Sequence, residues 1–276
     1  MKPRTSALDR RTAMRLAATE YQRCAELLRS LDSRGWAAPT ACPAWDVRQM
    51  AAHMLGMVEM AASIREGSRQ RRAATVDGNV DIDRLTALQV SERSGWSEPA
   101  ISDRFAARAP KAVRGRRMTP GFIRRRTMIG GVINGVEEPW TLGYVIDVIL
   151  TRDPWMHRLD ICTALDRAPH LTADHDGVIV ADVVGEWADR HGKDFTLHLT
   201  GLAGGTWAAG TAGPRIELDA AGFCRVIANG LARSTSPNSR APRFPTSTGR
   251  SQPLSRITTT SSSWEPGTRY PPRQCC

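Results

Sequence analysis

The chain has 276 residues, of which 41% are hydrophobic and 24% are charged, close to the averages of globular proteins. This length suits two modest domains, each with its own core. The six cysteines form no CxxC pair, which argues against a zinc knuckle and a disulfide framework. No apolar stretch is long enough to span a bilayer, and the N-terminus lacks a hydrophobic signal core, so we expect a cytoplasmic protein without a membrane partner.

The formal net charge of +10 raises the question of nucleic-acid binding. Residues 233–276 carry seven arginines against one glutamate, which accounts for most of the excess. A second basic stretch, residues 104–126, holds nine lysines and arginines, but no stacking aromatics or recognition helix accompany it. A solvated basic loop explains this stretch better, and the sequence therefore disfavours a nucleic-acid partner.

The first part of the chain predicts two helices and a loop between them. Residues 7–31 repeat apolar side chains at helical spacing. Residues 36–45, WAAPTACPAW, contain two prolines, so they predict a connecting loop with a tryptophan at each end. A second helix is expected to begin at Asp46 as N-cap and to end near residue 64, because Gln49 stands where a capping box places its second member.

Further helical segments are expected at residues 79–94 and 98–109, and another helix at residues 141–165. Between them, residues 110–139 are rich in Arg, Gly and Pro and predict a long irregular crossover. Residues 7–168 are therefore expected to form a four-helix bundle with one long connection, which makes the fold mainly α.

After residue 169 the pattern indicates a small α+β domain, residues 172–231. Its expected elements are a helix closed by Gly192, three strands and a final helix, at residues 174–191, 195–199, 206–210, 215–219 and 219–230. Residues 232–276 are dominated by Ser, Thr, Pro and Arg, so we predict a disordered tail. Such a tail would fit a linker, an interaction arm or a sequence read in a shifted frame.

Three side chains form a candidate metal site. Asp153 and His157 are four residues apart, so a helix over residues 141–165 presents both on one face. His53 lies in a row of the second helix that is expected to point into the bundle. Two histidines and one carboxylate make a three-ligand site with open positions, the arrangement of a catalytic zinc.

Each of these residues also has a simpler interpretation. A histidine that points inward is more often a hydrogen-bonded core residue than a ligand. Asp153 precedes Pro154, and such a pair commonly forms the N-cap and first position of a new helix. If the helix instead continues, Pro154 removes one backbone hydrogen bond and should kink it. Asp160 would either orient the imidazole of His157 or be an exposed partner of Arg158 or Arg167.

Two motifs carry a family resemblance. The stretch from residue 36 to 56, which includes PTACPAWDVRQMAAHMLG, and TRDPWMHRLDI at residues 151–161 resemble the mycothiol-dependent maleylpyruvate isomerase family. Residues 186–207 resemble the small C-terminal domain that this family often carries, so the similarity covers roughly residues 8–230. The resemblance implies a DinB-like four-helix bundle, a small α+β domain, and His53, Asp153 and His157 at the family's metal positions.

The resemblance also implies a function. Zinc or another divalent metal would activate the thiol of mycothiol, the cosubstrate, for attack on a small electrophilic or unsaturated acid. As an isomerase, the protein would let the sulfur add to the double bond of a cis-dicarboxylate, permit rotation and eliminate the trans isomer. As a transferase, it would leave the thiol attached to the electrophile. The alternative is a non-catalytic metal-binding DinB-like protein.

Three residues bear on substrate choice. The characterised isomerases of the family have glutamate at the position of Asp153, and the shorter carboxylate differs in reach by about one methylene while still suiting zinc. Arg48 and Arg225 are the candidate catalytic residues, because a dicarboxylate substrate needs a cation near the metal. The alternative for Arg225 is that its helix only buries the aliphatic stem.

Overall fold

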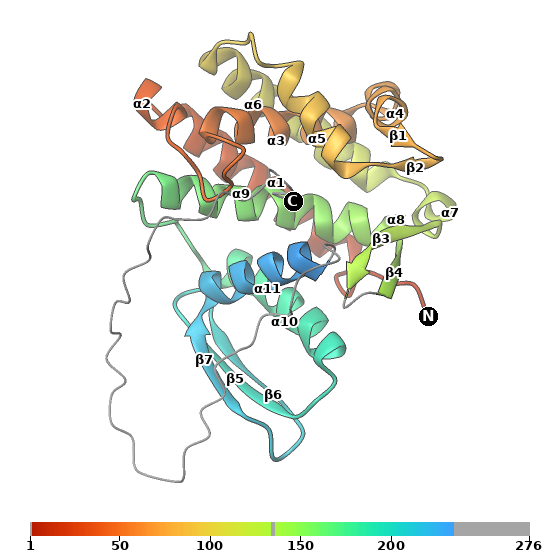
Figure 1. Ribbon diagram of the computed structural model, residues 1–276, viewed down its shortest axis with the longest axis vertical. Helices are drawn as coiled ribbons and strands as arrows, with labels where there is room; N and C mark the ends of the chain where they lie inside the picture. The colour runs from red at the N-terminus through yellow and green to blue at the C-terminus, as the bar shows by residue number, and fades with distance from the viewer. Residues whose placement is uncertain (1, 134–135, 235–276) are drawn as a thin grey trace.

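The computed structural model describes residues 2–133 and 136–234 (Figure 1). A layer of helices from the first part of the chain lies over a small α+β unit from the C-terminal part. This confirms the predicted mainly α fold with a small α+β region. The predicted tail lies outside the described residues, except that the last helix continues to Ser234. Within the described ranges, no helix combines the length and apolar character needed to cross a bilayer.

Four long helices form the helical layer and pack against one another. They are α1 (Arg10–Arg29), α3 (Val47–Ala62), α6 (Glu98–Met118) and α9 (Leu150–Ala164). Leu28, Met50, Phe105 and Ile161, one from each helix, are fully buried in a common core. Their burial removes apolar surface from water, which stabilises the layer by about 25 cal/mol per Å² of that surface.

The start of α3 follows the predicted capping box. The Asp46 carboxylate accepts a 2.8 Å hydrogen bond from the backbone N–H of Gln49, and the Gln49 side chain accepts a 2.9 Å bond from the backbone N–H of Asp46. The loop before α3 holds only the short helix α2 (Ser33–Trp36). The reciprocal pair fixes where α3 begins and therefore which face of the helix carries His53.

Beyond α3, two short helices cover its outer side. Ser63 leaves the helical conformation at φ −148° and ψ 120°, and its hydroxyl caps α4 (Ile64–Ala73). A hairpin of β1 (Thr75–Val76) and β2 (Asn79–Val80) then leads to α5 (Ile82–Ser91). Both α4 and α5 pack on α3. The helix expected at residues 79–94 is thus present, whereas α4 was not anticipated.

The irregular crossover predicted for residues 110–139 is wrong. Helix α6 continues through Pro110 to Met118, although the proline costs a backbone hydrogen bond. Ala109, Ala112 and Arg116 on this half of the helix are buried, so tertiary packing outweighs the local penalty. After α7 (Gly121–Arg124), β3 (Thr127–Ile133) and β4 (Val136–Thr141) pair as an antiparallel hairpin.

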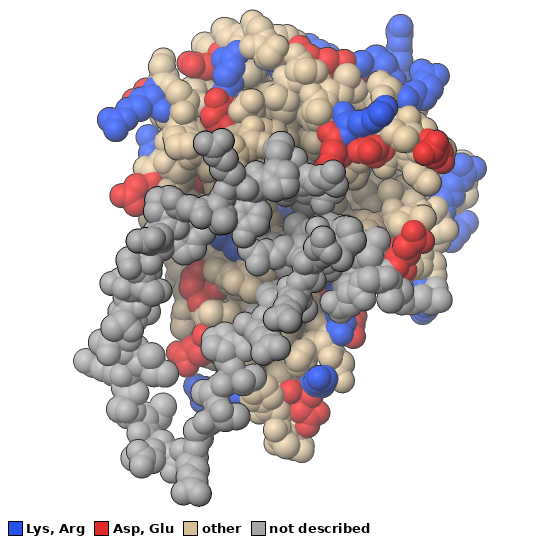
Figure 2. Space-filling model, in the orientation of Figure 1, with Lys and Arg blue, Asp and Glu red and all other residues tan. Residues whose placement is uncertain are grey.

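The basic stretch at residues 104–126 is consequently not a solvated loop. Arg116 is 2% exposed and donates to the Tyr21 hydroxyl and to the Thr151 hydroxyl. Arg104 pairs with Glu59 at 2.7 Å, and Arg124 pairs with Asp147. Figure 2 shows acidic side chains lying among basic ones over the helical layer. Much of the positive charge in this stretch is therefore used in ion pairs and buried contacts.

The helix predicted at residues 141–165 is present with an irregular start. It comprises α8 (Leu142–Tyr144), a π-helical turn η1 (Val145–Ile149) and α9. Because Pro154 has no N–H to donate, the carbonyl of Leu150 loses its helical partner. Arg116 Nη1 donates to that carbonyl at 3.0 Å and the Tyr21 hydroxyl does so at 3.4 Å. Asp153 therefore lies inside a continuous helix, and the interpretation of Asp153 as an N-cap is wrong.

The C-terminal unit follows the predicted order of elements. After the π-turn η2 (Ala173–Gly177) come α10 (Val178–His191), β5 (Phe195–Thr200), β6 (Gly205–Ala209), β7 (Arg215–Asp219) and α11 (Ala220–Ser234). Strand β5 is central, antiparallel to β6 and parallel to β7. Gly192 ends α10 at φ +61°, a left-handed conformation that glycine adopts without strain.

The core of this unit is shared with the helical layer. Leu16 of α1 and Trp155 and Leu159 of α9 are buried in one cluster with Val180 and Phe223 of the C-terminal unit. The α+β unit thus covers the face of α9 that points away from the core of the helical layer, and α9 is packed on both sides. The division into domains at residues 7–168 and 172–231 stays a prediction.

Candidate metal centre

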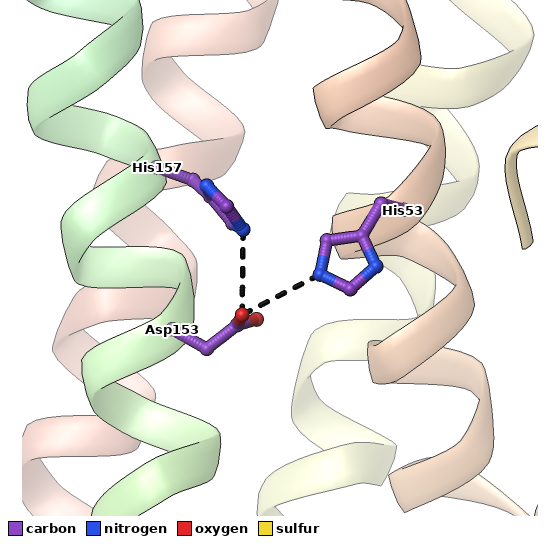
Figure 3. A group of neighbouring side chains, drawn as sticks. All are labelled: His53, Asp153 and His157. Carbon is purple, nitrogen blue, oxygen red and sulfur yellow. Dashed lines mark hydrogen bonds and ion pairs between the residues drawn. The ribbon is translucent and has the colours of Figure 1, made fainter. Parts of the chain in front are cut away.

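The structure brings the three predicted ligands together (Figure 3). His53 projects from α3, and Asp153 and His157 project from one face of α9. The Oδ1 atom of Asp153 lies 3.4 Å from Nε2 of His53 and 3.3 Å from Nε2 of His157. The ligand atoms all lie within 4.8 Å of one another, so one cation can reach all three side chains.

The polar atoms at this centre are incompletely satisfied by the protein. Asp153 Oδ2 and both ring nitrogens of His157 are buried and form no hydrogen bond with any described residue. A buried polar atom without a partner costs about 1–3 kcal/mol, and a coordinated cation would remove that cost. Two imidazoles with one carboxylate are a ligand set that zinc accepts. The residues therefore fit a divalent cation.

The local charges keep the carboxylate ionised. Burial acts to raise the pKa of Asp153, but the neighbouring His157 and His53 outweigh it and hold that pKa well below the ordinary aspartate value. Burial acts to lower the pKa of His157, but the Asp153 carboxylate outweighs it and raises that pKa. The site thus keeps an anionic oxygen ligand, and protons compete with a cation for His157.

Trp45 covers the centre. It belongs to the loop that precedes α3, and its ring centroid lies 5.2 Å from that of His53 and 6.2 Å from that of His157. The two imidazoles are perpendicular to each other at 5.2 Å. His53 is 1% exposed and His157 is 5% exposed, whereas the Asp153 side chain is 16% exposed, so the two imidazoles are shielded from bulk water and the carboxylate stays partly accessible.

The two candidate catalytic arginines lie apart from each other and have protein partners. Arg48 donates to the backbone carbonyls of Ser94 and Trp96. Arg225 reaches from α11 to α9, where its guanidinium donates to the carbonyl of Leu159 at 3.0 Å. It also lies 3.5 Å from Asp160 and donates to Thr163. Asp160 thus pairs with Arg225 of the C-terminal unit, whereas Arg158, one of its two expected partners, pairs with Glu20 and Asp176.

A second group of potential ligands, Glu20, His175 and Asp176, is a salt-bridge network instead. Arg158 donates to Glu20 at 2.6 Å and to Asp176 at 2.7 Å, while His175 lies 2.8 Å from Glu20. Asp176 also accepts a 2.6 Å bond from Arg23. The cationic side chains already neutralise both carboxylates, so this group has no need of a metal ion.

Two residues at the metal centre escaped the sequence interpretation. Gln89 of α5 hydrogen-bonds Nδ1 of His53 at 2.8 Å, and nothing in the pattern of residues 79–94 distinguishes this glutamine from a surface residue. Trp45 is the last residue of the motif at residues 36–45, but the prolines and tryptophans of that motif indicate only a loop with a tryptophan at each end. The contact with His53 depends on how the loop folds back over α3.

Comparison with known proteins places the chain in a family. The profile of the mycothiol maleylpyruvate isomerase N-terminal domain matches residues 17–162, more than half of the chain and the part that holds all three candidate ligands. The helical layer of the protein is thus that of a known class of domain. It belongs to the mycothiol maleylpyruvate isomerase N-terminal domain family.

Solved structures support the same fold. The crystal structure of the mycothiol-dependent maleylpyruvate isomerase matches with a TM-score of 0.52 and 15% identity, covering 86% of this chain and 98% of that chain. A mutant of that enzyme with a histidine replaced by alanine matches over the same shares with a TM-score of 0.50 and 15% identity. At this identity the likeness concerns the fold alone. No curated protein sequence matches the chain significantly.

Proposed function

We propose that the chain is a metal- and mycothiol-dependent isomerase or thiol transferase, similar to maleylpyruvate isomerase, that acts in the cytoplasm on a small electrophilic or unsaturated acid. The observation that carries this proposal is that ligand atoms of His53, Asp153 and His157 all lie within 4.8 Å of one another, and that several of these buried atoms form no hydrogen bond with a described residue. Family membership supports the choice of thiol chemistry.

The three side chains would hold zinc or another divalent cation. When bound, such a cation supplies Lewis acidity, which lowers the pKa of a thiol and favours the nucleophilic thiolate. Three protein ligands leave coordination positions open, as catalytic sites require. The cysteines Cys24, Cys162 and Cys224 are buried, and burial raises the pKa of each thiol, so the nucleophile is better supplied by mycothiol.

The chain's own residues prepare the site for this chemistry. Asp153 contributes the negative charge that retains a cation between two neutral imidazoles. Trp45 restricts water at the ligands, which strengthens electrostatic interactions there. Arg225 is anchored on α9 beside Asp160, three residues after His157, so it remains our candidate for binding a substrate carboxylate from the C-terminal unit. Arg48 is the corresponding candidate on α3.

Turnover in the presence of mycothiol tests the proposed function. Zinc-loaded protein should consume a cis-unsaturated dicarboxylate or a small electrophile only when mycothiol is present. Formation of the trans isomer without loss of thiol indicates an isomerase, whereas loss of free thiol in proportion to product indicates a transferase. If metal binds but no member of a broad substrate panel reacts, the non-catalytic metal-binding alternative replaces the proposal.

Arg225→Met should separate substrate binding from metal binding. Methionine keeps an unbranched aliphatic stem but loses the guanidinium. We expect kcat/KM for a dicarboxylate to fall by about 10- to 100-fold, the value of one charge-assisted hydrogen bond of about 1.5–3 kcal/mol, while zinc stoichiometry is unchanged. Steady-state kinetics together with metal analysis provide the measurement. Unchanged kcat/KM would show that Arg225 does not bind the substrate and has only a structural role.

A further inference from the structure

A continuous chain of buried hydrogen bonds leads away from His53. The ring Nδ1 lies 2.8 Å from Oε1 of Gln89 on α5. The Nε2 of Gln89 donates to Oε1 of Gln70 on α4 at 2.8 Å, and the Nε2 of Gln70 donates to Oε1 of Glu66 at 2.8 Å. Gln89 and Gln70 are both 0% exposed, so water does not compete for these bonds.

Glu66, at the end of this series of hydrogen bonds, determines which group donates and which accepts in each bond. An ionised carboxylate only accepts hydrogen bonds, whereas a glutamine amide both donates and accepts. Glu66 therefore requires the NH₂ group of Gln70 to face it, which turns the Gln70 carbonyl towards Gln89. The Gln89 NH₂ group must then face Gln70, which leaves the Gln89 carbonyl to accept from His53. Consequently the proton of neutral His53 is placed on Nδ1, and Nε2 keeps its lone pair.

Two further observations fix Gln89. The sulfur atoms of Met57 and Met60 each lie 3.3 Å from Nε2 of Gln89, and sulfur is a weak acceptor that suits the amide nitrogen better than the oxygen. A Cβ atom at Gly56 would lie 2.4 Å from Cγ of Gln89, so the lack of a side chain at Gly56 is what lets Gln89 approach α3. Packing and hydrogen bonding thus agree on one orientation.

Glu66 is held as a carboxylate, so it can only accept the hydrogen bond from Gln70. Hydrogen bonds from Arg69 are the main cause that lowers the pKa of Glu66 to about 2, so it stays a carboxylate at neutral pH. Arg69 holds it by a bond of 2.6 Å and also pairs with Glu92 at 2.7 Å. Glu66 and Glu92 both line a cavity of about 480 Å³ between α3, α4, α6 and the segment that follows α5.

At the metal centre, Asp153 favours the opposite tautomer of His53. Asp153 lies 3.4 Å from Nε2 of His53 and, as a carboxylate, favours a proton on that nitrogen. A proton on Nε2 would block coordination, because a histidine binds metal through a lone pair. The tautomer of His53 is therefore decided between two carboxylates, Asp153 acting directly and Glu66 acting through two amides.

We propose that Glu66 is a positioning residue of the metal centre, which sets the Nδ1–H tautomer of His53 through Gln70 and Gln89 and so keeps Nε2 available as a ligand. This inference rests on the proposed metal site and extends it to residues on α4 and α5, which carry none of the three ligands. Glu66 contacts none of the three ligands, and its effect on them is transmitted by the direction of the hydrogen bonds.

The test compares Glu66→Gln with Glu92→Gln. Both substitutions preserve volume, remove one negative charge and take one partner from Arg69 at the same cavity, but only Glu66 belongs to the chain of bonds. In Glu66→Gln the new amide can donate as well as accept, so Gln70 no longer has to donate to residue 66. Only the 3.4 Å bond from Gln70 Nε2 to the Gly56 carbonyl and the weak contacts of Gln89 Nε2 with Met57 and Met60 then oppose a reversal of the two amides. We expect His53 to populate the Nε2–H form substantially in this variant and the Nδ1–H form in wild type and Glu92→Gln.

Long-range ¹H–¹⁵N NMR of the imidazoles measures the tautomer in chelator-treated protein at about pH 8, where free imidazole is neutral. A zinc titration of the same samples should show about 10- to 100-fold weaker binding in Glu66→Gln only, the usual effect of losing an outer-shell partner. An unchanged Nδ1–H tautomer in Glu66→Gln, or an Nε2–H tautomer in wild type, overturns the proposal. If wild type binds no zinc, the proposed function fails, while the NMR comparison still decides the role of Glu66.

Discussion

Replacing His53 by alanine is expected to abolish stoichiometric metal binding. The purified protein should bind about one zinc ion, and the variant should bind far less, because Asp153 and His157 alone leave two protein ligands on a cation that needs about four. Since a ligand that binds only the folded state stabilises it, zinc at 100 times its Kd should add about 2.7 kcal/mol to the free energy of unfolding of wild type. The variant should gain nothing.

Metal analysis and thermal denaturation with and without zinc provide the measurements. For wild type, the added stability should raise Tm by roughly 5–10 °C. His198→Ala is the matched control, because His198 lies on β5 and hydrogen-bonds Thr206 rather than a member of the metal centre. Equal zinc stoichiometry in His53→Ala and His198→Ala would show that His53 is not a ligand. The proposed function, which depends on this metal site, would then fail.

Replacing Arg158 by methionine should destabilise the fold severely, whether or not metal is present. Arg158 is 3% exposed and bridges Glu20 and Asp176, both 0% exposed. Removing one member of a buried ion pair leaves uncompensated charge, which typically costs about 3–5 kcal/mol. We expect Tm to fall by roughly 6–20 °C in chelator-treated protein.

The matched control is Arg29→Met. Arg29 lies 3.9 Å from Asp103, and their side chains are 54% and 74% exposed, so this pair should contribute under about 1 kcal/mol. Similar losses of stability in both variants would show that the buried network holds α1, α9 and η2 together no better than a surface ion pair.

The effect of Arg158→Met should also depend on pH. Burial acts to raise the pKa of Glu20, but the hydrogen bond from His175 and the charge of Arg158 outweigh it and leave that pKa lowered. A carboxylate with a lowered pKa in the folded state stabilises the protein above its unfolded pKa, near 4 for Glu and Asp, and loses this contribution as pH falls. In the variant, Glu20 keeps His175 and Asp176 keeps Arg23, but both carboxylates lose the Arg158 charge, and protonation relieves part of the cost of burying them. The Tm difference between wild type and variant should therefore narrow below about pH 4.

The sequence predicted local structure well where one local rule dominated. The capping box of Asp46 and Gln49 fixed the start of α3, and the four-residue spacing of Asp153 and His157 placed both on one face of α9. It failed between residues 110 and 139, where Pro110 and several glycines suggested an irregular chain. There, burial of Ala112 and Arg116 against other helices maintained a helix that local propensity does not favour.

By itself, then, the sequence determined the periodicity of the long helices, the order of the elements in the C-terminal unit and the three candidate ligands, because caps, spacings and motifs act over a few residues along the chain. Only the tertiary structure decided that Pro154 is accommodated by Arg116 and Tyr21, that Trp45 covers His53, and that Gln89 reaches His53 past Gly56. These contacts join residues from separate elements, and their geometry depends on how whole helices pack, which no local pattern encodes.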